Sequence, residues 1–382
     1  MIKGFSKKFI FMAKPIIKMM LKKEINVVAN GDTITKDREP FILISNHLNT
    51  WDTLIVMKNI DYDVKFVTTE MVFLDKSNKL GNHLIDEGIN KKPGKVDIEA
   101  TKKILEYIKK GYAIGIFPEE DKTFYGETIS ISEYSGLLIK KANIDVVLVK
   151  QSGGYLSQPR WADNFAKMGF VITNTETLIT KKELKNLTPA IISKMIEKAI
   201  YNNEYEFQRD SMIKFDRDNR AEGIERVLYY CNSCYSTMTV FGKDNEIYCS
   251  KCGKIGHINE FEFIVGNEFD NLVDYNKYQY SFIEKVISSE FVFVTSLNKI
   301  DLDNYKSIML GQYKVRYKDK ALLFTDKDTT YTFELEKIKN PSNTMRDNFS
   351  FDYGKNTYNL SNLRHQFVLF EMCRFLKENS KK

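Results

Sequence analysis

Apolar runs of strand length alternate with helical stretches from about residue 26 to residue 215. Such alternation is typical of an α/β domain, here a mixed sheet flanked by helices. Two of the helical stretches have recognisable ends. Asp97 can cap a helix over residues 98–110 that Gly111 stops, and Thr188 with Pro189 opens one that runs through Tyr201. The predicted strands are residues 41–45, 64–69, 84–89, 112–117, 145–150 and 169–173.

Four of the five cysteines form two CxxC pairs, Cys231 with Cys234 and Cys249 with Cys252, separated by 14 residues. Each pair and its tight turn can form one knuckle, and two knuckles complete a tetrahedral thiolate site for zinc. Four ligands leave no open coordination position, so the zinc should be structural and its binding should contribute to folding. So few cysteines in a chain of this length exclude a disulfide-stapled secreted module.

The excess of basic residues lies in one short tail. Residues 1–23 carry seven lysines and no acid, one charge more than the net +6 of the whole chain, so the other residues together carry −1. The chain therefore lacks a broad basic face, and no nucleic-acid partner is expected. At 100° per residue the apolar residues of the tail form one stripe with lysines opposite, as in a helix on an anionic membrane surface. The alternative is an ordinary first helix docked on the core.

No apolar run approaches the roughly 20 residues that a membrane-spanning helix needs. The length of 382 residues predicts more than one domain. Residues 210–225 are polar and charge-dense, like a linker, and the pattern after the cysteines is β-rich. Short β-rich runs at 291–297, 313–317, 321–325, 330–335 and 349–353 precede an amphipathic helix at 361–377, an order similar to that of a pleckstrin-homology module.

The domains that we expect are a basic amphipathic membrane-contact segment at 1–25 and an α/β domain at 26–215, followed by two further parts. These are a linker with the zinc ribbon at 216–265, and a small β-rich accessory domain with a C-terminal helix at 266–382.

The sharpest motif in the α/β part is Asn46-His47, followed five positions after the histidine by Asp52, directly after an apolar strand. Residues five apart point about 140° apart on a regular helix, so His47 and Asp52 can meet only across a turn that enters the next helix, 51–57. Asp52 would then accept a hydrogen bond from one imidazole nitrogen and leave the other as a general base. The adjoining helix N-terminus would offer partial positive charge to a developing oxyanion. The alternative is a structural histidine at a strand end.

A second motif, Phe117-Pro118-Glu119, ends another predicted strand with a proline turn and an acid. Ligands bind at the carboxyl ends of strands in α/β sheets, so we expect it on the same edge as His47. The chain has no GxSxG elbow and no cysteine in its α/β part, so it offers no evident nucleophile of its own. A base without a nucleophile indicates that a substrate hydroxyl attacks an activated acyl group.

These two motifs, some 65 residues apart, resemble the blocks of the glycerolipid acyltransferase superfamily, particularly bacterial 1-acyl-glycerol-3-phosphate (lysophosphatidate) acyltransferases. The resemblance covers roughly residues 30–210 and includes residues 153–161 after the last apolar block. It implies that His47 is the general base on the glycerol 2-hydroxyl, that Asp52 orients it, and that Glu119 helps to hold the acceptor. It also implies an acyl-CoA or acyl-carrier-protein thioester as donor and no other organic cofactor. The residues that it places at the substrate are Asn46, Phe117 and Pro118.

The chain departs from the family in the third block, which usually reads Phe-Pro-Glu-Gly-Thr-Arg and here ends in Glu120, Asp121 and Lys122. The glutamate adds negative charge beside a phosphate site, and lysine lacks the bidentate fork of arginine. The second block of the family normally ends in an arginine that contacts phosphate, where this chain offers lysines. The changes leave acyl transfer intact and the identity of the acceptor open. The candidate phosphate contacts are Lys91, Lys92, Lys122 and Arg160.

The sequence therefore predicts a peripheral membrane acyltransferase at the cytoplasmic, inner face of the cell membrane. It would transfer a fatty acyl group to the free hydroxyl of 1-acyl-glycerol-3-phosphate or a related lysophospholipid in phospholipid synthesis. The alternative is a catalytically impaired lipid-binding or scaffold protein, which the altered third block favours.

Overall fold

The computed structural model describes residues 23–69, 88–91, 97–119, 121–131, 134–301, 306–325, 330–343 and 346–379. Nearly all of the basic tail and the first four residues of the strand predicted at 84–89 lie outside these ranges. The chain divides into two compact units, the α/β unit of residues 1–160 and 166–216 and the second unit of residues 161–165 and 217–382. In the described part of the chain, no helix is long and apolar enough to cross a bilayer.

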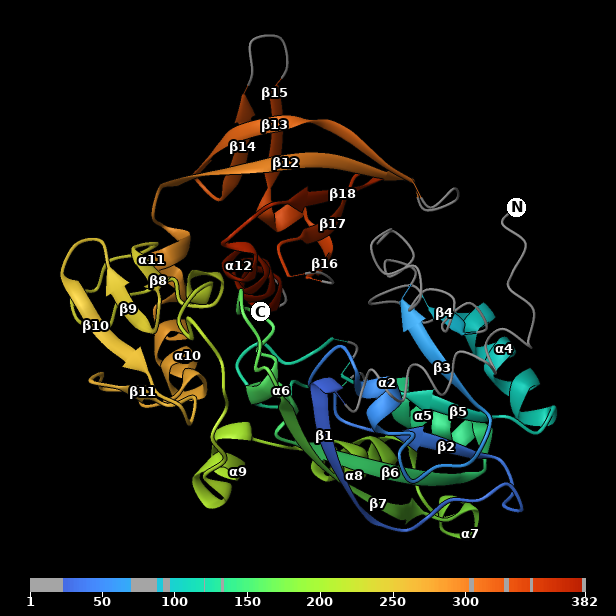
Figure 1. Cartoon of the computed structure of the whole chain (residues 1–382). Helices are drawn as coiled ribbons and strands as arrows, with labels where there is room; N and C mark the ends of the chain where they lie inside the picture. Colours follow the sequence, from blue (N-terminus) through green and yellow to red (C-terminus); the bar gives the residue numbers. More distant parts are fainter. Residues whose placement is uncertain are drawn as a thin grey trace. The chain divides into compact units, whose positions relative to one another are not determined.

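One seven-stranded sheet organises the α/β unit, in the order β1-β7-β6-β2-β5-β3-β4 (Figure 1). β7 runs antiparallel to β6, and all other neighbours pair in parallel, so the sheet is mixed as the sequence predicts. The strands are β1 (Ile25–Gly31), β2 (Phe41–Ile44), β3 (Val64–Thr69), β4 (Ile89–Lys91), β5 (Ala113–Ile116), β6 (Asp145–Ser152) and β7 (Gly169–Ile179).

The core lies on both faces of this sheet because β2 is buried on both sides. Ile42 and Ile44 pack against apolar residues of α5 and α8, whereas Phe41 and Leu43 pack on the opposite face against residues between 34 and 60. A strand buried on both faces reads as a continuous apolar run, which is why β2 is predictable. The helices are α2 (Asp52–Ile55), α4 (Ile98–Lys109), α5 (Tyr134–Ala142), α6 (Gly154–Ser157), α7 (Lys181–Leu184), α8 (Pro189–Ile200) and α9 (Glu204–Ser211).

Both predicted helix starts are present. The Asp97 carboxylate accepts the Ala100 N–H at 2.9 Å at the start of α4, and the Thr188 hydroxyl accepts the Ile191 N–H at 3.3 Å at the start of α8. These contacts satisfy amides that have no partner inside the helix.

The sequence patterns miss β1 and shorten β7. β1 is a half-exposed edge strand that pairs in parallel with β7 from Ile25 opposite Gly169 to Gly31 opposite Thr175, so it has no continuous apolar run. The prediction for β7 stops at Thr173, where the apolar run ends, but Thr173 and Thr175 are both buried. Polar β-branched residues continue the strand with alternating burial.

The second unit contains two antiparallel sheets. The first follows the cysteine pairs in the order β11-β10-β9-β8, and the second has seven strands in the order β15-β14-β13-β12-β18-β17-β16 with α12 packed into its core (Figure 1). The elements are β8 (Val240–Lys243), β9 (Glu246–Cys249), β10 (Gly253–Ile258), β11 (Ile264–Val265), α10 (Leu272–Tyr280), α11 (Ile283–Ile287), β12 (Phe291–Asp301), β13 (Lys306–Lys318), β14 (Ala321–Thr325), β15 (Thr330–Glu334), β16 (Lys339–Ser342), β17 (Phe349–Tyr353), β18 (Asn356–Ser361) and α12 (Gln366–Asn379), with short 3₁₀ turns η2 (Ile224–Arg226) and η3 (Leu335–Lys337).

The C-terminal helix begins later than its predicted start at residue 361. β18 occupies Asn356–Ser361, pairing with both β12 and β17, so α12 begins only at Gln366. Cys373, the cysteine outside the two CxxC pairs, lies in the core on α12.

The passage predicted to be a linker, residues 210–225, is packed into the structure. Phe215, Arg217 and Ile224 are almost fully buried. The Arg217 guanidinium donates to the Glu262 carboxylate, with Nε to Oε1 at 3.1 Å, and lies over the ring of Trp161. Charge density indicated a solvated linker, but ion pairing lets these charges be buried.

We expect Arg217→Leu to lower the free energy of unfolding by about 3 kcal/mol or more, because it leaves the buried Glu262 carboxylate without its main partner. The exposed Arg316–Glu290 pair, at 2.6 Å in the same unit, supplies the matched control. Arg316→Leu should cost less than about 1 kcal/mol. Urea unfolding of the full-length variants measures the two losses in free energy of unfolding. Equal losses would show that burial does not make the Arg217–Glu262 pair more important for stability than an exposed pair.

Candidate active site and metal centre

The loop that carries His47 leaves the carboxyl end of β2 and is tied to β6 by Asn46. The Asn46 side-chain amide donates to the Gln151 carbonyl at 2.9 Å and accepts the Gln151 N–H at 2.8 Å. Asn46 is fully buried, and both ends of its amide are used by the backbone of β6. The contacts of Asn46 are therefore those of a residue that positions the loop, and the substrate contact expected for it stays a prediction.

His47 and Asp52 meet across this loop. The distance from His47 Nδ1 to Asp52 Oδ2 is 2.6 Å, and the same oxygen accepts the backbone N–H groups of Leu48 at 2.7 Å and Asn49 at 3.1 Å. Asp52 is 1% exposed. Because Asp52 is an acceptor on the Nδ1 side, the proton lies on Nδ1 and the lone pair of the neutral ring lies on Nε2.

The imidazole is also held by an aromatic ring. His47 stacks on Phe117, with ring centroids 4.4 Å apart and an interplanar angle of 21°. Its side chain remains 24% exposed, and no hydrogen-bond partner for Nε2 occurs among the described residues. The second motif therefore does lie beside the first, and it fixes the ring while Nε2 stays accessible.

Glu119 braces the same loop. Its carboxylate accepts the backbone N–H of His47 at 2.8 Å through Oε1 and that of Ile129 at 3.0 Å through Oε2. Glu119 is 4% exposed, and burial raises the pKa of its carboxyl to about 8. The resemblance implies that Glu119 holds the acceptor, but both oxygens are bonded to backbone, so its contacts are those of a positioning residue. Pro118 beside it is buried.

Asp121, Lys122 and Arg160 form a compact group at the same end of the sheet. Lys122 Nζ donates to Thr50 Oγ1 at 3.3 Å, and Arg160 Nη1 donates to Asp121 Oδ1 at 2.7 Å. Burial and the neighbouring Arg160 lower the pKa of the Lys122 ammonium to about 8, and burial lowers the pKa of the Arg160 guanidinium. Of the other candidate phosphate contacts, Lys92 and the side chain of Lys91 lie outside the described residues.

Glu204 is a buried site residue that the sequence patterns missed. Its carboxylate accepts the backbone N–H groups of Gly153 at 2.9 Å and Tyr155 at 3.1 Å, and it also accepts the Asn202 side chain at 2.6 Å. Burial raises the pKa of its carboxyl to about 7. Gly153 and Tyr155 lie some 50 residues away, so no local motif could indicate these contacts.

The segment that Glu204 holds approaches the His47 loop closely. A Cβ added at Gly154 would lie 3.1 Å from Asn49 Nδ2 and 3.2 Å from Leu48, so glycine is what lets the two loops pack. Gly153 has φ +88°, a backbone conformation that also favours glycine. The Gly153-Gly154 pair thus lets this segment pack closely against the loop that carries His47.

The helix after the loop is shorter than predicted. α2 spans only Asp52–Ile55, a single turn, rather than residues 51–57. One turn carries little of a helix macrodipole, and the nearby amides of Leu48 and Asn49 already donate to Asp52. The structure therefore gives less support than the sequence did to oxyanion stabilisation by this helix N-terminus.

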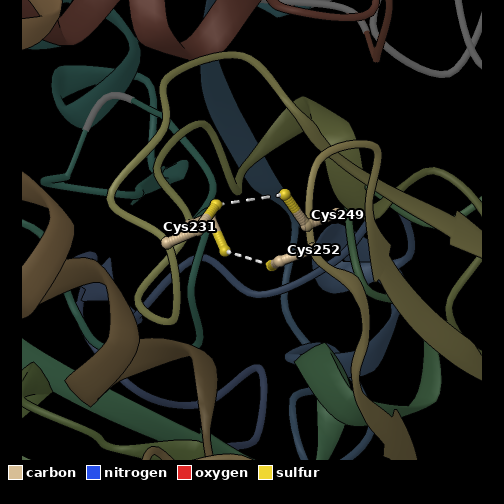
Figure 2. Close-up of side chains that lie close together, drawn as sticks. Cys231, Cys249 and Cys252 are labelled. Carbon is tan, nitrogen blue, oxygen red and sulfur yellow. Dashed lines mark hydrogen bonds between the residues drawn. The ribbon is translucent and has the colours of Figure 1, made fainter.

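The four paired cysteines converge in the second unit (Figure 2). Their sulfur atoms all lie within 4.8 Å of one another, with Cys231 to Cys252 and Cys234 to Cys249 at 3.6 Å each. Thiolates around a tetrahedral metal with bonds of about 2.3 Å would lie about 3.8 Å apart, so the four residues fit a metal ion. Turns at both pairs allow this: the Tyr235 N–H donates to the Cys231 carbonyl at 2.9 Å, and Gly253 has φ +88°.

Two buried carboxyls of the α/β unit, those of Glu119 and Glu204, have raised pKa values and predict that its stability falls as pH rises. The folded-state pKa values of Glu119 and Glu204 are about 8 and about 7, above the ordinary 4.5. At pH values between the ordinary pKa and the folded-state pKa, the unfolded chain binds fewer protons than the folded chain. The free energy of unfolding should therefore decrease from about pH 5 to about pH 8.

Urea midpoints of the full chain across this range measure the slope. Glu204→Gln should reduce the dependence of the urea midpoint on pH, even if it also shifts the midpoint at every pH. Glu206, which is exposed on the same helix, supplies the control, and Glu206→Gln should leave this pH dependence unchanged. Identical slopes for the wild type and Glu204→Gln would contradict the assignment.

Comparisons with known proteins found partial similarity to solved structures. The chain matches no protein-family model and no curated protein sequence. It is similar to the crystal structure of the 1-acyl-sn-glycerophosphate (LPA) acyltransferase PlsC from Thermotoga maritima, at 20% identity and a TM-score of 0.40. The similarity covers 51% of this chain and 82% of that one.

Proposed function

We propose that this protein is a peripheral membrane acyltransferase that moves a fatty acyl group from an acyl thioester to the free hydroxyl of a lysolipid. The observation that carries the proposal is the His47–Asp52 pair, in which the buried carboxylate holds Nδ1–H and Nε2 stays accessible. A structural histidine would be expected to have both ring nitrogens bonded or buried.

The pair can act as a general base. His47 Nε2 takes the proton from the acceptor hydroxyl as its oxygen attacks the thioester carbonyl. Asp52 stabilises the imidazolium that forms and keeps its orientation. When the tetrahedral intermediate collapses, the C–S bond breaks and the imidazolium returns the proton to the departing thiolate. The products are an ester and a free thiol, and no residue of the chain is acylated.

The surrounding residues prepare His47 for this role. Phe117 stacks on the ring, Glu119 holds the His47 backbone, and Asn46 anchors the loop to β6. Holding a base within a fraction of an ångström of its working position is a large part of catalysis by proximity. The resemblance of these motifs to glycerolipid acyltransferases supports an acyl-CoA or acyl-carrier protein as donor.

The proposed lipid substrate and the basic tail both favour a location of this protein at the membrane surface. Residues 1–23 would contact the anionic inner face of the cell membrane, and the acyltransferase domain at 26–215 would work from the cytoplasmic side in phospholipid synthesis. The β-rich part with α12 would be an accessory domain like a pleckstrin-homology module.

We expect His47→Ala to lower the rate of acyl transfer by about 10²- to 10⁴-fold, because the general base is lost. Asp52→Asn should lower it by a similar factor, because the imidazole loses its orienting acceptor. Release of free thiol from an acyl-CoA in the presence of lysolipid acceptors, among them 1-acyl-glycerol-3-phosphate, measures the rate.

His257→Gln, on β10 of the second unit, is the matched histidine control and should retain full activity. Thermal unfolding checks that each variant is folded. If wild type and His47→Ala release thiol at the same rate, the catalytic proposal fails and the lipid-binding or scaffold interpretation takes its place.

We also propose that the four cysteines bind structural zinc. Four thiolates complete a tetrahedral site, leave no position for substrate, and prefer zinc among abundant divalent metals. The metal would join the turn before β8 to the turn between β9 and β10, and its binding would contribute to the stability of the second unit.

Purified full-length protein should contain one zinc ion per chain by elemental analysis. Cys249→Ser should lose the metal and lower the unfolding temperature, because three thiolates bind zinc more weakly. Cys373→Ser, in the core and away from the cluster, should keep the full metal content. Wild-type protein without stoichiometric metal, or Cys249→Ser with an undiminished content, would refute the assignment.

A further inference from the structure

A group of charged residues flanks the proposed base. Two residues that follow Glu119 contact the His47 loop. The Thr123 N–H donates to the His47 carbonyl at 3.1 Å, and Lys122 Nζ donates to Thr50 Oγ1 at 3.3 Å. Asp121 and Arg160 adjoin Lys122 in the same group. These side chains therefore adjoin the loop that carries the proposed base, where the head group of a bound lysolipid could reach them.

Only one of the two terminal nitrogens of the Arg160 guanidinium has hydrogen-bond partners among the residues that the structure describes. Nη1 donates to Asp121 Oδ1 at 2.7 Å and to the Lys122 carbonyl at 3.0 Å, and the flat guanidinium lies 4.0 Å from the ring centre of Phe124. The side chain is 5% exposed. Nη2 is buried and has no hydrogen-bond partner within the described ranges. One donor group of the fork therefore remains, and Asp121 pairs with the guanidinium charge, while the neighbouring Lys122 ammonium donates to Thr50.

A phosphate monoester is recognised best by an unpaired guanidinium that offers two parallel N–H donors. Here the Asp121 carboxylate occupies one of the two positions, and a dianion at Nη2 would share the guanidinium with it. Like charges held this close repel strongly in a partly buried site. A single hydrogen-bond acceptor from a head group without net charge avoids this repulsion.

We infer that Asp121 determines acceptor specificity: by holding Arg160 it excludes lysolipids with a phosphate monoester and selects those whose head group has no net charge. The inference rests on the proposed function, since it names the acceptor class for the same site. Asp121 acts here through Arg160, so it is a positioning residue rather than a catalytic one.

The test compares kcat/KM for three acceptors with one acyl thioester, using the full-length protein. The acceptors are 1-acyl-glycerol-3-phosphate, which is dianionic, 1-acyl-glycero-3-phosphocholine, which is zwitterionic, and a monoacylglycerol, which is uncharged. Wild type should prefer the two acceptors without net charge. Asp121→Asn should raise kcat/KM for the dianionic acceptor about tenfold, chiefly through KM, because it frees a charged hydrogen-bond donor.

Two further variants identify Arg160 as the cause. Adding Arg160→Gln to Asp121→Asn should remove the gain for the dianionic acceptor. Asp145→Asn is the matched control, because Asp145 also pairs with an arginine of the α/β unit, Arg38, at 2.9 Å. It should leave the order of acceptors unchanged. If Asp121→Asn does not fold, Asp121→Thr, the residue of the resembling family at this position, replaces it with the same expected result.

The outcomes separate the two proposals. Turnover that is fastest with 1-acyl-glycerol-3-phosphate in wild type, or an acceptor preference that neither substitution at Asp121 changes, overturns the inference and leaves acyl transfer standing. Absence of turnover with every acceptor in every variant overturns the proposed function and the inference together.

Discussion

The candidate site depends on one carboxylate oxygen. Asp52 Oδ2 accepts the Nδ1–H of His47 together with the backbone N–H groups of Leu48 and Asn49, so the ring and the loop that carries it are fixed by the same atom. A loop of irregular backbone at a strand end would otherwise leave buried amides without partners. The requirement to satisfy these amides and the requirement to orient a base are met by a single side chain. Removing that carboxylate would disturb both at once.

The sequence predicted the part of the site whose partners lie close together along the chain. His47 and Asp52 are five residues apart, and a turn between a strand and a helix is enough to bring them into contact. The cysteine pairs are predictable for the same reason, because each CxxC knuckle is local and the metal chemistry joins the two. The mixed sheet followed from apolar runs such as β2, which is buried on both faces.

Contacts between distant segments and between charged residues could not be predicted in this way. Asn46 bonds to Gln151, more than a hundred residues later, and Glu204 bonds to the backbone near Gly153. Residues 210–225 indicated a linker because their charges were counted without their partners, whereas Arg217 is buried against Glu262. Composition records how many charges a segment carries. Only the fold decides which of them are paired.

Glu119 has a consequence for how such sites evolve. Both of its oxygens accept backbone N–H groups, those of His47 and Ile129, and every amino acid except proline supplies that donor. Substitutions at those partner positions can therefore keep the bonds, and no compensating change at Glu119 is called for. Methods that detect contacts through correlated substitution have nothing to register here. Such a contact is seen only in coordinates, even when it supports the residue proposed as the catalytic base.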